Sequence, residues 1–399
     1  MSLGGKRRFL YWLLGGLVLG IGVGFVGGER VAVLGELGAL VIVLLKALAM
    51  PLVFFAVADS LQKAELPVRQ GVRLLGLCVT NAAVACLLAV SLAYLIRPGA
   101  GVDPALFSGP APAAPLDVAV LPLPQRALQL LLNNAVLVLV LLALASGAAL
   151  RRLRHQGRAV RLGKLVEDGF QFLATVLSYV ILLVPLAVFG VVAKMVGTLG
   201  LAPFRSLGML CLTVAAGLIL HVTIYYSLLV WVVGRRSPFA FWRAATDALI
   251  TALSTGSSMA TLPVTLRTLE DRLHVTPQSA RLAACIGTNF NNDGIMLYEV
   301  VAAIFIAQAA GIDLDPAQIA MLAATSALAA AGIAGVPEAG LITLSLVMSA
   351  AGLPAAGLPM LLSVDWMLGR LRAATNVASD LTIATVLDRW AGPAEPRQT

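Results

Sequence analysis

The sequence predicts an all-α polytopic membrane protein, and three observations lead to this fold class. Of the 399 residues, 59% are hydrophobic and only 12% are charged, which is about half the charged fraction of a soluble globular chain. The mean hydropathy is +0.93. Apolar runs of roughly 18 to 30 residues recur along the chain, and a helix needs about 20 apolar residues to cross the hydrocarbon core. These features argue against a soluble enzyme and against a β-barrel, whose strands alternate over about ten residues.

Six membrane-spanning helices are expected in the first part of the chain. Basic residues precede the first run and no convincing cleavage site follows it, so we expect that the first helix is retained. A loop rich in Pro, Ala and Gly, between Pro98 and Gln125, leads into the fourth run and is expected to be mobile. The expected spans are 9–26, 31–60, 72–96, 116–150, 165–193 and 203–234.

Lysine and arginine are concentrated in every second loop, most densely between Arg151 and Lys164. This asymmetry predicts a multi-pass protein of the cell inner (plasma) membrane with cytoplasmic N- and C-termini. It also explains the net charge of +8 as a topology signal, so no nucleic-acid partner is expected, whereas membrane lipid is an expected partner of the basic loop. The four cysteines lie in apolar runs, so neither a zinc site nor a disulfide framework is expected.

Beyond residue 240 the apolar segments become short. The segment 239–264 is interrupted by the polar residues 254–258, and the segment 319–348 is interrupted at 332–337. Each piece is too short to span a membrane. Two broken segments in corresponding positions predict the re-entrant hairpins of an inverted-repeat secondary transporter, because unwound backbone at membrane depth is tolerated only where it lines a cavity.

A helix with polar residues at membrane depth follows each hairpin. In the first, the run 287–294 is rich in Asn, with one Asp. In the second, spacings of seven, four and four separate Asp365, Arg372, Asn376 and Asp380. These spacings place the four side chains on one stripe. Burying a charged side chain in a membrane costs roughly 3 kcal/mol on insertion scales, so we expect the stripe to face the bundle interior or an aqueous pathway.

Together these motifs resemble the dicarboxylate/amino acid:cation symporter family, which has the glutamate-transporter fold and includes sodium:dicarboxylate symporters. The resemblance covers almost the whole chain. It rests on the order and spacing of motifs at 49–54, 97–101, 256–263, 287–294, 332–340 and 372–380.

The resemblance implies eight transmembrane helices plus two re-entrant hairpins, arranged as inverted repeats in an elevator-type homotrimer. Substrate and cations would bind between the two hairpin tips. The implied division is scaffold helices 1–2 at 1–70, transport-domain helix 3 at 71–97, scaffold helices 4–5 with the preceding loop at 98–200, transport-domain helix 6 at 201–238, hairpin 1 at 239–277, broken helix 7 at 278–310, hairpin 2 at 311–355, and helix 8 with the C-terminal tail at 356–399.

Sodium ions are the expected coupling ions, with H⁺ as the alternative. Asp380 and Asn376 lie one turn apart, and Gly287 and Asn291 could add backbone carbonyls, which is a ligand set that suits Na⁺. By resemblance, a second site uses the backbone of Asn289 and the second tip.

A third cation site would pair Asp293 and Asn291 with the third helix. There the family has a Tyr and a Thr-Ser pair, whereas this chain has Cys78, Asn81 and Ala82, which favours two cations rather than three. In the alternative interpretation, the Asn and Asp residues only tie the broken helices together.

Arg372 is the expected ligand of a small anionic solute, because a guanidinium binds a carboxylate bidentately. The alternative is a structural pair with Asp365 or Asp380. In amino-acid carriers of the family an Asp and a Thr stand where this chain has Gly369 and Ala373. The loss of that Asp favours a dicarboxylate such as succinate, fumarate or malate.

The tip of the first hairpin also favours a dicarboxylate as the substrate. Amino-acid carriers of the family can have an Arg where this chain has Gly256, and its absence leaves Ser257 and Ser258 to bind a second carboxylate. The other expected substrate contacts are Ile295, Gly335, Val336, Pro337 and Asn376.

Three positions depart from the pattern of the family. Ile295 replaces a Thr, Asn292 replaces a Met, and Glu338 stands in the second tip where many members have Gly. Glu338 is interpreted as a solubilising residue, a cation attractor or proton acceptor, or a partner for a substrate ammonium. The last of these would favour an amino acid.

The predicted function is therefore symport of Na⁺ (or H⁺) with a small dicarboxylate, and no enzymatic activity is expected. The alternative within the family is a Na⁺-coupled symporter of acidic or neutral amino acids, and an uncoupled anion channel on the same fold is a third hypothesis. An intramembrane hydrolase is the competing class. It would use His221 with the tip serines, or Asp293 with Asp365, but neither pair has the sequence context that such enzymes show.

Overall fold

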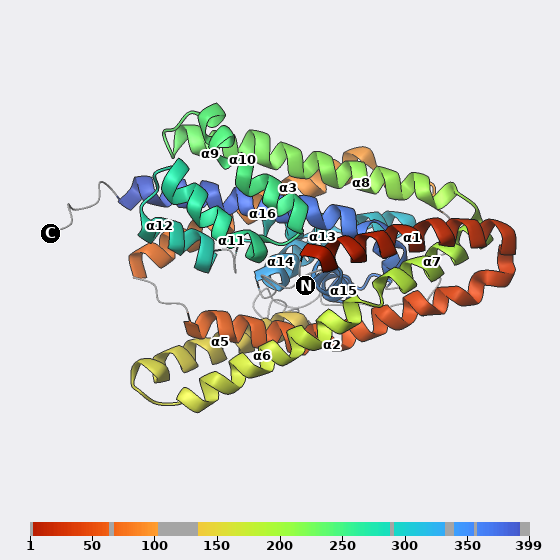
Figure 1. Ribbon diagram of the computed structural model, residues 1–399, viewed down its shortest axis with the longest axis horizontal. Coiled ribbons are helices and arrows are strands. Elements are labelled where there is room, and N and C mark those ends of the chain that lie inside the picture. The colour runs from red at the N-terminus through yellow and green to blue at the C-terminus, as the bar shows by residue number, and fades with distance from the viewer. Residues whose placement is uncertain are drawn as a thin grey trace.

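The structure is a computed structural model, and every regular element in the part of the chain that it describes is a helix (Figure 1). Most of the helices run along the long axis of the molecule. The described residues are 3–63, 68–102, 135–287, 291–331, 339–354 and 357–391.

The first two helices are joined by a tight reversal. Helix α1 (Leu3–Gly27) leads into the 3₁₀ turn η1 (Gly28–Leu34), where the ribbon turns back into α2 (Gly35–Lys63) (Figure 1). Gly28 has φ +53°, a left-handed conformation that glycine adopts without steric cost. The turn therefore converts one long apolar stretch into two helices.

Helix α1 packs on α7 (Val184–Leu199) through glycines spaced four apart. A Cβ built on Gly16 would lie 2.6 Å from the Pro185 carbonyl oxygen, and one on Gly20 would lie 2.7 Å from the Phe189 carbonyl oxygen. Small residues at this spacing let helix backbones approach closely, as in membrane helix pairs.

The predicted fifth span, 165–193, is a longer, bent pair of helices. Helix α6 (Val160–Ile181) and α7 meet at an angle of 43°. Pro185 stands in the first turn of α7, where its ring and missing N–H prevent the preceding helix from continuing. Helix α5 (Ala135–His155) precedes this pair, and residues 116–134 of the predicted fourth span lie outside the described residues.

Three apolar stretches of the described residues are long enough to cross a membrane, and the bent pair is a fourth candidate. The first, Tyr11–Lys63, contains both α1 and α2. The second, Gln70–Ile96, is most of α3 (Val68–Ile96). The third contains α8 (Ala202–Leu220), the π-helical turn η4 (His221–Tyr226) and α9 (Ser227–Val232).

Helix α10 (Pro238–Thr255) and α11 (Ser258–Arg267) form an antiparallel hairpin. Gly256 ends α10 with φ +63°, and the Ser257 side chain caps α11 by accepting a hydrogen bond from the Ala260 N–H at 3.2 Å. The chain therefore turns at the serine-rich segment that the sequence singles out.

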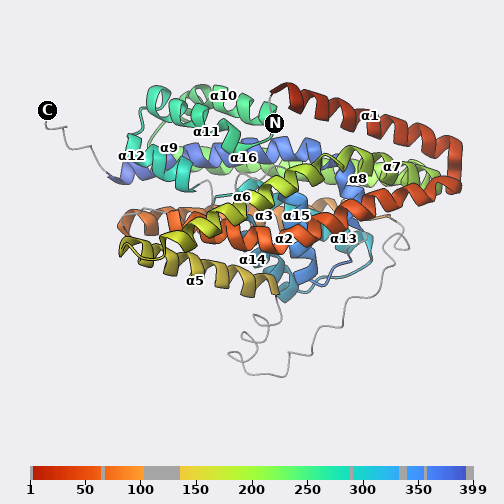
Figure 2. The same ribbon diagram turned by 60° about the horizontal axis from the view of Figure 1, so that its bottom comes forward.

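The C-terminal half places one long helix at its centre. Helix α16 lies between the α10–α11 hairpin and the helices α13 and α15, and contacts all of them (Figure 2). The elements of this part are α12 (Pro277–Arg281), η5 (Thr268–Arg272), η6 (Leu282–Ile286), α13 (Asp293–Ala309), α14 (Pro316–Ala331), α15 (Ala339–Ala350) and α16 (Leu358–Ala391).

Candidate functional site

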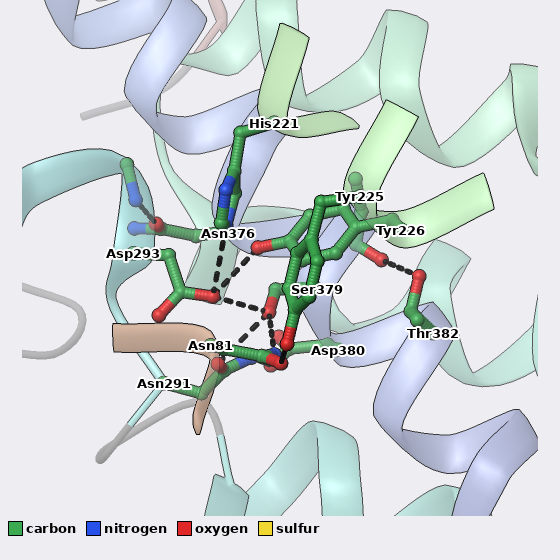
Figure 3. Close-up of polar contacts among 12 residues, drawn as sticks. Asn81, His221, Tyr225, Tyr226, Asn291, Asp293, Asn376, Ser379, Asp380 and Thr382 are labelled. Atoms are coloured by element: carbon green, nitrogen blue, oxygen red, sulfur yellow. Dashed lines mark hydrogen bonds and ion pairs between the residues drawn. The ribbon is translucent and has the colours of Figure 1, made fainter. Parts of the chain in front are cut away.

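A cluster of polar side chains lies where four elements meet (Figure 3). Helix α3, the π-helical turn η4, the start of α13 and the middle of α16 each contribute to it. We call it the polar cluster; its residues are Asn81, Tyr225, Tyr226, Asn291, Asp293, Ser379 and Asp380, and all except the half-buried Tyr225 are buried.

Asp293 is the acidic centre of the polar cluster. Its Oδ2 accepts hydrogen bonds from the Tyr226 hydroxyl at 2.6 Å and from the Ser379 hydroxyl at 2.8 Å. His221 Nε2 is 3.7 Å from the same oxygen. Among the described residues, no lysine or arginine forms an ion pair with this carboxylate, which is 1% exposed. A buried carboxylate without a cationic partner is costly, so this position suits a bound cation.

Ser379 holds the broken start of α13 against α16. Its hydroxyl is 2.8 Å from Asn291 Oδ1 and 2.8 Å from Asp293 Oδ2. A hydroxyl has one hydrogen to donate, so it can satisfy only one of these two acceptors at a time. One of the two oxygens, Asn291 Oδ1 or Asp293 Oδ2, is therefore left without a hydrogen bond from Ser379.

Asn81 links α3 to the same cluster. Its amide nitrogen donates to Ser379 Oγ at 3.1 Å, and its Oδ1 accepts from the Tyr225 hydroxyl at 2.8 Å. Asn291 donates to Asp380 Oδ1 at 3.1 Å. The structure thus brings together four predicted cation-site residues: Asn81, Asn291, Asp293 and Asp380.

The side chains of the polar cluster offer mainly oxygen atoms as ligands for a cation. No group of three or more His, Cys, Asp or Glu side chains that could hold a metal ion occurs in the described parts of the chain. Carboxylate, amide and hydroxyl oxygens instead suit hard cations. The chemistry of the polar cluster fits an alkali cation such as Na⁺.

Asn376 and Gly287 have different surroundings from those expected. Asn376 Oδ1 accepts from the Gly294 N–H at 2.9 Å, and its amide nitrogen donates to Asn292 Oδ1 at 3.1 Å. The Gly287 carbonyl accepts from the Asn291 N–H at 2.8 Å. Asn376 therefore ties the break before α13 to α16, in line with the alternative interpretation for this residue.

Arg372 is buried beside the break and is 4% exposed. Its Nη1 donates to Asp365 Oδ1 at 2.7 Å, and its Cζ lies 4.2 Å from the centroid of the Tyr298 ring. The pair with Asp365, which was the alternative to a role in solute binding, is thus present. Because a guanidinium has five N–H donors in a fixed fork, a solute carboxylate can share it with Asp365.

Two glycines make room for this guanidinium. A Cβ on Gly340 would lie 2.5 Å from Arg372 Nη1, and one on Gly369 would lie 3.2 Å from Nη2. Gly369 stands where amino-acid carriers of the family are expected to have an Asp. In this chain the Arg372 guanidinium lies next to the position that the Asp side chain would take.

The remaining predicted substrate contacts divide into two groups. Ser257, Ser258 and Ile295 are half-buried, and Ala373 is buried next to Arg372. Asn289 and Glu338 lie outside the described residues, as do three predicted tip contacts, Gly335, Val336 and Pro337.

Sequence reasoning missed the roles of Ser379, Tyr225, Tyr226 and Glu299. The two tyrosines lie in a π-helical turn, a feature frequent at functional sites, but its hydrogen-bonding pattern leaves no sequence signature. Glu299 is fully buried, and neither of its carboxylate oxygens has a hydrogen-bond partner among the described residues. The sequence did contain one indication of Glu299, because an acidic residue within an apolar run is often functional.

Comparison with known proteins identifies the family of this chain. The model of the sodium:dicarboxylate symporter family matches residues 9–390. Excitatory amino acid transporter 2 of Mus musculus is 47% identical over 176 residues, which are 44% of this chain and 31% of the relative. Excitatory amino acid transporter 1 of Ambystoma tigrinum is 36% identical over 254 residues, which are 63% of this chain and 46% of the relative.

Excitatory amino acid transporter 4 of Mus musculus is 37% identical over 254 residues, which are 63% of this chain and 45% of the relative. The matched part of this chain therefore spans less than half the length of each of these curated relatives.

Proposed function

This chain belongs to the sodium:dicarboxylate symporter family, a family of transporters rather than enzymes, and we propose that it is a Na⁺-coupled symporter of small acidic solutes. The observation that carries the proposal is a buried guanidinium, Arg372, in the same helix as Ser379 and Asp380 of the polar cluster. One element would then bind both the anionic solute and the cation.

The relatives are named as excitatory amino acid transporters, which favours an amino acid as the solute, and the buried guanidinium of Arg372 favours an acidic one. Asp365 supports this class, because its Oδ2 is buried and has no hydrogen-bond partner among the described residues. That oxygen is available to accept from a substrate ammonium while Oδ1 holds Arg372. Glu338 is a further candidate partner for the ammonium.

A C4-dicarboxylate is the second candidate, and Gly369 is the observation that favours it. With no side chain at this position, the Asp expected in amino-acid carriers is missing, and Arg372 Nη2 occupies the space around it. Succinate, fumarate or malate would need no ammonium partner.

The helix contacts support an elevator mechanism. Helix α1 packs along α7, and α2 packs along α5, α6 and α7, whereas α16 packs on α10, α11, α13, α15 and α8 and meets the first group at α7. We assign the first group to a fixed scaffold and the second, with α3, to a moving unit, in a homotrimer with eight membrane-spanning helices, two re-entrant hairpins and cytoplasmic termini. Na⁺ is the coupling ion in this proposal, with H⁺ as the alternative.

Uptake into proteoliposomes tests the proposal. We expect accumulation of radiolabelled aspartate or succinate against its gradient when Na⁺ is outside, and no accumulation when choline replaces Na⁺. Arg372→Ala should abolish accumulation, and the exposed Arg243→Ala should preserve it as a matched control. Uptake that ignores the choline replacement would refute Na⁺ coupling, and uptake that never exceeds equilibrium would indicate a channel.

Mutual competition identifies the solute class. If aspartate and glutamate inhibit uptake at lower concentration than succinate and malate, the amino-acid candidate holds. The reverse order supports the dicarboxylate candidate.

A further inference from the structure

We propose that the side-chain amide of Asn292 takes the place of a cation at the end of α14, so that a hydrogen bond rather than a Na⁺ ion holds this arm of the second hairpin. The inference rests on the proposed Na⁺ coupling and concerns the number of ions. Asn292 stands directly before α13 and is 1% exposed. Its amide nitrogen donates to the Ala330 carbonyl at 2.9 Å.

The Ala330 carbonyl belongs to the last turn of α14. The last four carbonyls of an α-helix have no N–H partner within the helix, and the helix dipole places partial negative charge there. Such a helix end attracts an N–H donor or a cation, and carbonyls at the ends of broken helices bind Na⁺ in membrane transporters. The resemblance described above predicts a second cation site at this hairpin. In this chain the Asn292 amide lies at the oxygen instead.

A backbone donor fixes the orientation of this amide. The Gly294 N–H donates to Asn376 Oδ1 at 2.9 Å, so the amide nitrogen of Asn376 points away from Gly294. That nitrogen donates to Asn292 Oδ1 at 3.1 Å, which leaves the amide nitrogen of Asn292 for the Ala330 carbonyl. Turning either amide over would bring two donors or two acceptors together. The contact between Asn292 and α14 is therefore a donated hydrogen bond.

The amide and a cation compete for the same carbonyl oxygen. Both present positive charge to it, and the hydrogen bond is buried, so water does not screen the amide from a Na⁺ ion bound beside it. Met, which the family motif has at position 292, has no N–H to donate and leaves such a carbonyl open to a cation. The Asn of this chain therefore removes one cation from the second hairpin and leaves Na⁺ binding to the polar cluster.

The test is the dependence of solute affinity on Na⁺, measured by calorimetry on the purified protein with aspartate or succinate. Below saturation, the slope of log Kd for the acid against log [Na⁺] reports the number of Na⁺ ions that bind with it. Asn292→Met should steepen this slope by about one ion, because the freed carbonyl then binds Na⁺. At low Na⁺ the variant should bind the acid roughly 2- to 10-fold more weakly, since one hydrogen bond is lost.

Gln308→Met is the matched control. The Gln308 amide nitrogen donates to the Ala93 carbonyl in the last turn of α3 at 2.9 Å, which is the same kind of contact at another helix end. This variant should keep the wild-type slope.

An unchanged slope in Asn292→Met would overturn the proposal and assign the amide a purely structural role. If Asn292→Met does not fold, the slope in Asn292→Leu, which also lacks a donor, decides. A wild-type protein that binds the acid equally well at every Na⁺ concentration would instead refute the proposed Na⁺ coupling itself.

Discussion

Gly340→Ala should weaken solute binding while leaving the protein folded. The added Cβ would lie 2.5 Å from Arg372 Nη1 and 2.7 Å from Cζ, well inside normal contact distance. The guanidinium is the movable end of a long side chain, so it should shift by about 1 Å and lengthen the 2.7 Å hydrogen bond to Asp365. The displaced guanidinium should also lose a charge-assisted hydrogen bond to the solute carboxylate, which contributes about 1.5–3 kcal/mol and corresponds to roughly a 10- to 100-fold loss of affinity.

The assay is the KM for solute uptake, with thermal unfolding in detergent as the check on folding. Gly22→Ala is the matched control, because a Cβ at Gly22 meets nothing within 4 Å. Gly369→Ala, with a contact of 3.2 Å to Arg372 Nη2, should be intermediate. A normal KM in Gly340→Ala would refute the placement of Arg372 as the carboxylate ligand.

Three other substitutions test the polar cluster and the helix packing. Ser379→Ala should raise the Na⁺ concentration for half-maximal uptake roughly tenfold, since it removes a hydroxyl oxygen that would bind the cation; an unchanged Na⁺ dependence would contradict this. Asp293→Asn should abolish stimulation by Na⁺, measured against choline. Gly20→Leu should lower the free energy of unfolding by about 1–3 kcal/mol through its contact with α7, measured by denaturation in detergent, and equal destabilisation by Gly22→Leu would argue against that contact.

Much of the fold follows from hydrophobic length and polar interruption. The turn at Gly256 coincides with the predicted break at 254–258, because an apolar segment that meets serine and glycine at membrane depth has to turn back. The stripe on α16 was predictable because helix geometry fixes which residues share a face. Asp365 and Arg372 lie on this stripe two turns apart, and Arg372 donates a hydrogen bond to Asp365.

Other features depend on tertiary contacts that a single sequence does not reveal. The π-helical turn that brings in Tyr225 and Tyr226, and the position of Ser379 between Asn291 and Asp293, are set by packing among four elements. Ser and Tyr are ordinary residues in apolar helices, so the residue types alone did not indicate that these side chains belong to the polar cluster. The 43° bend between α6 and α7 falls inside the span expected at 165–193, where Pro185 begins a new helix.

The dependence of solute affinity on Na⁺ tests the central claim most directly. If the polar cluster binds Na⁺ and Arg372 binds the solute on the same helix, each should strengthen the binding of the other by the same factor, typically 5- to 150-fold. Calorimetry on the purified protein should therefore show a lower Kd for the transported acid in Na⁺ than in choline, and a matching gain in Na⁺ affinity when the acid is present. Equal Kd values in the two salts would contradict the account.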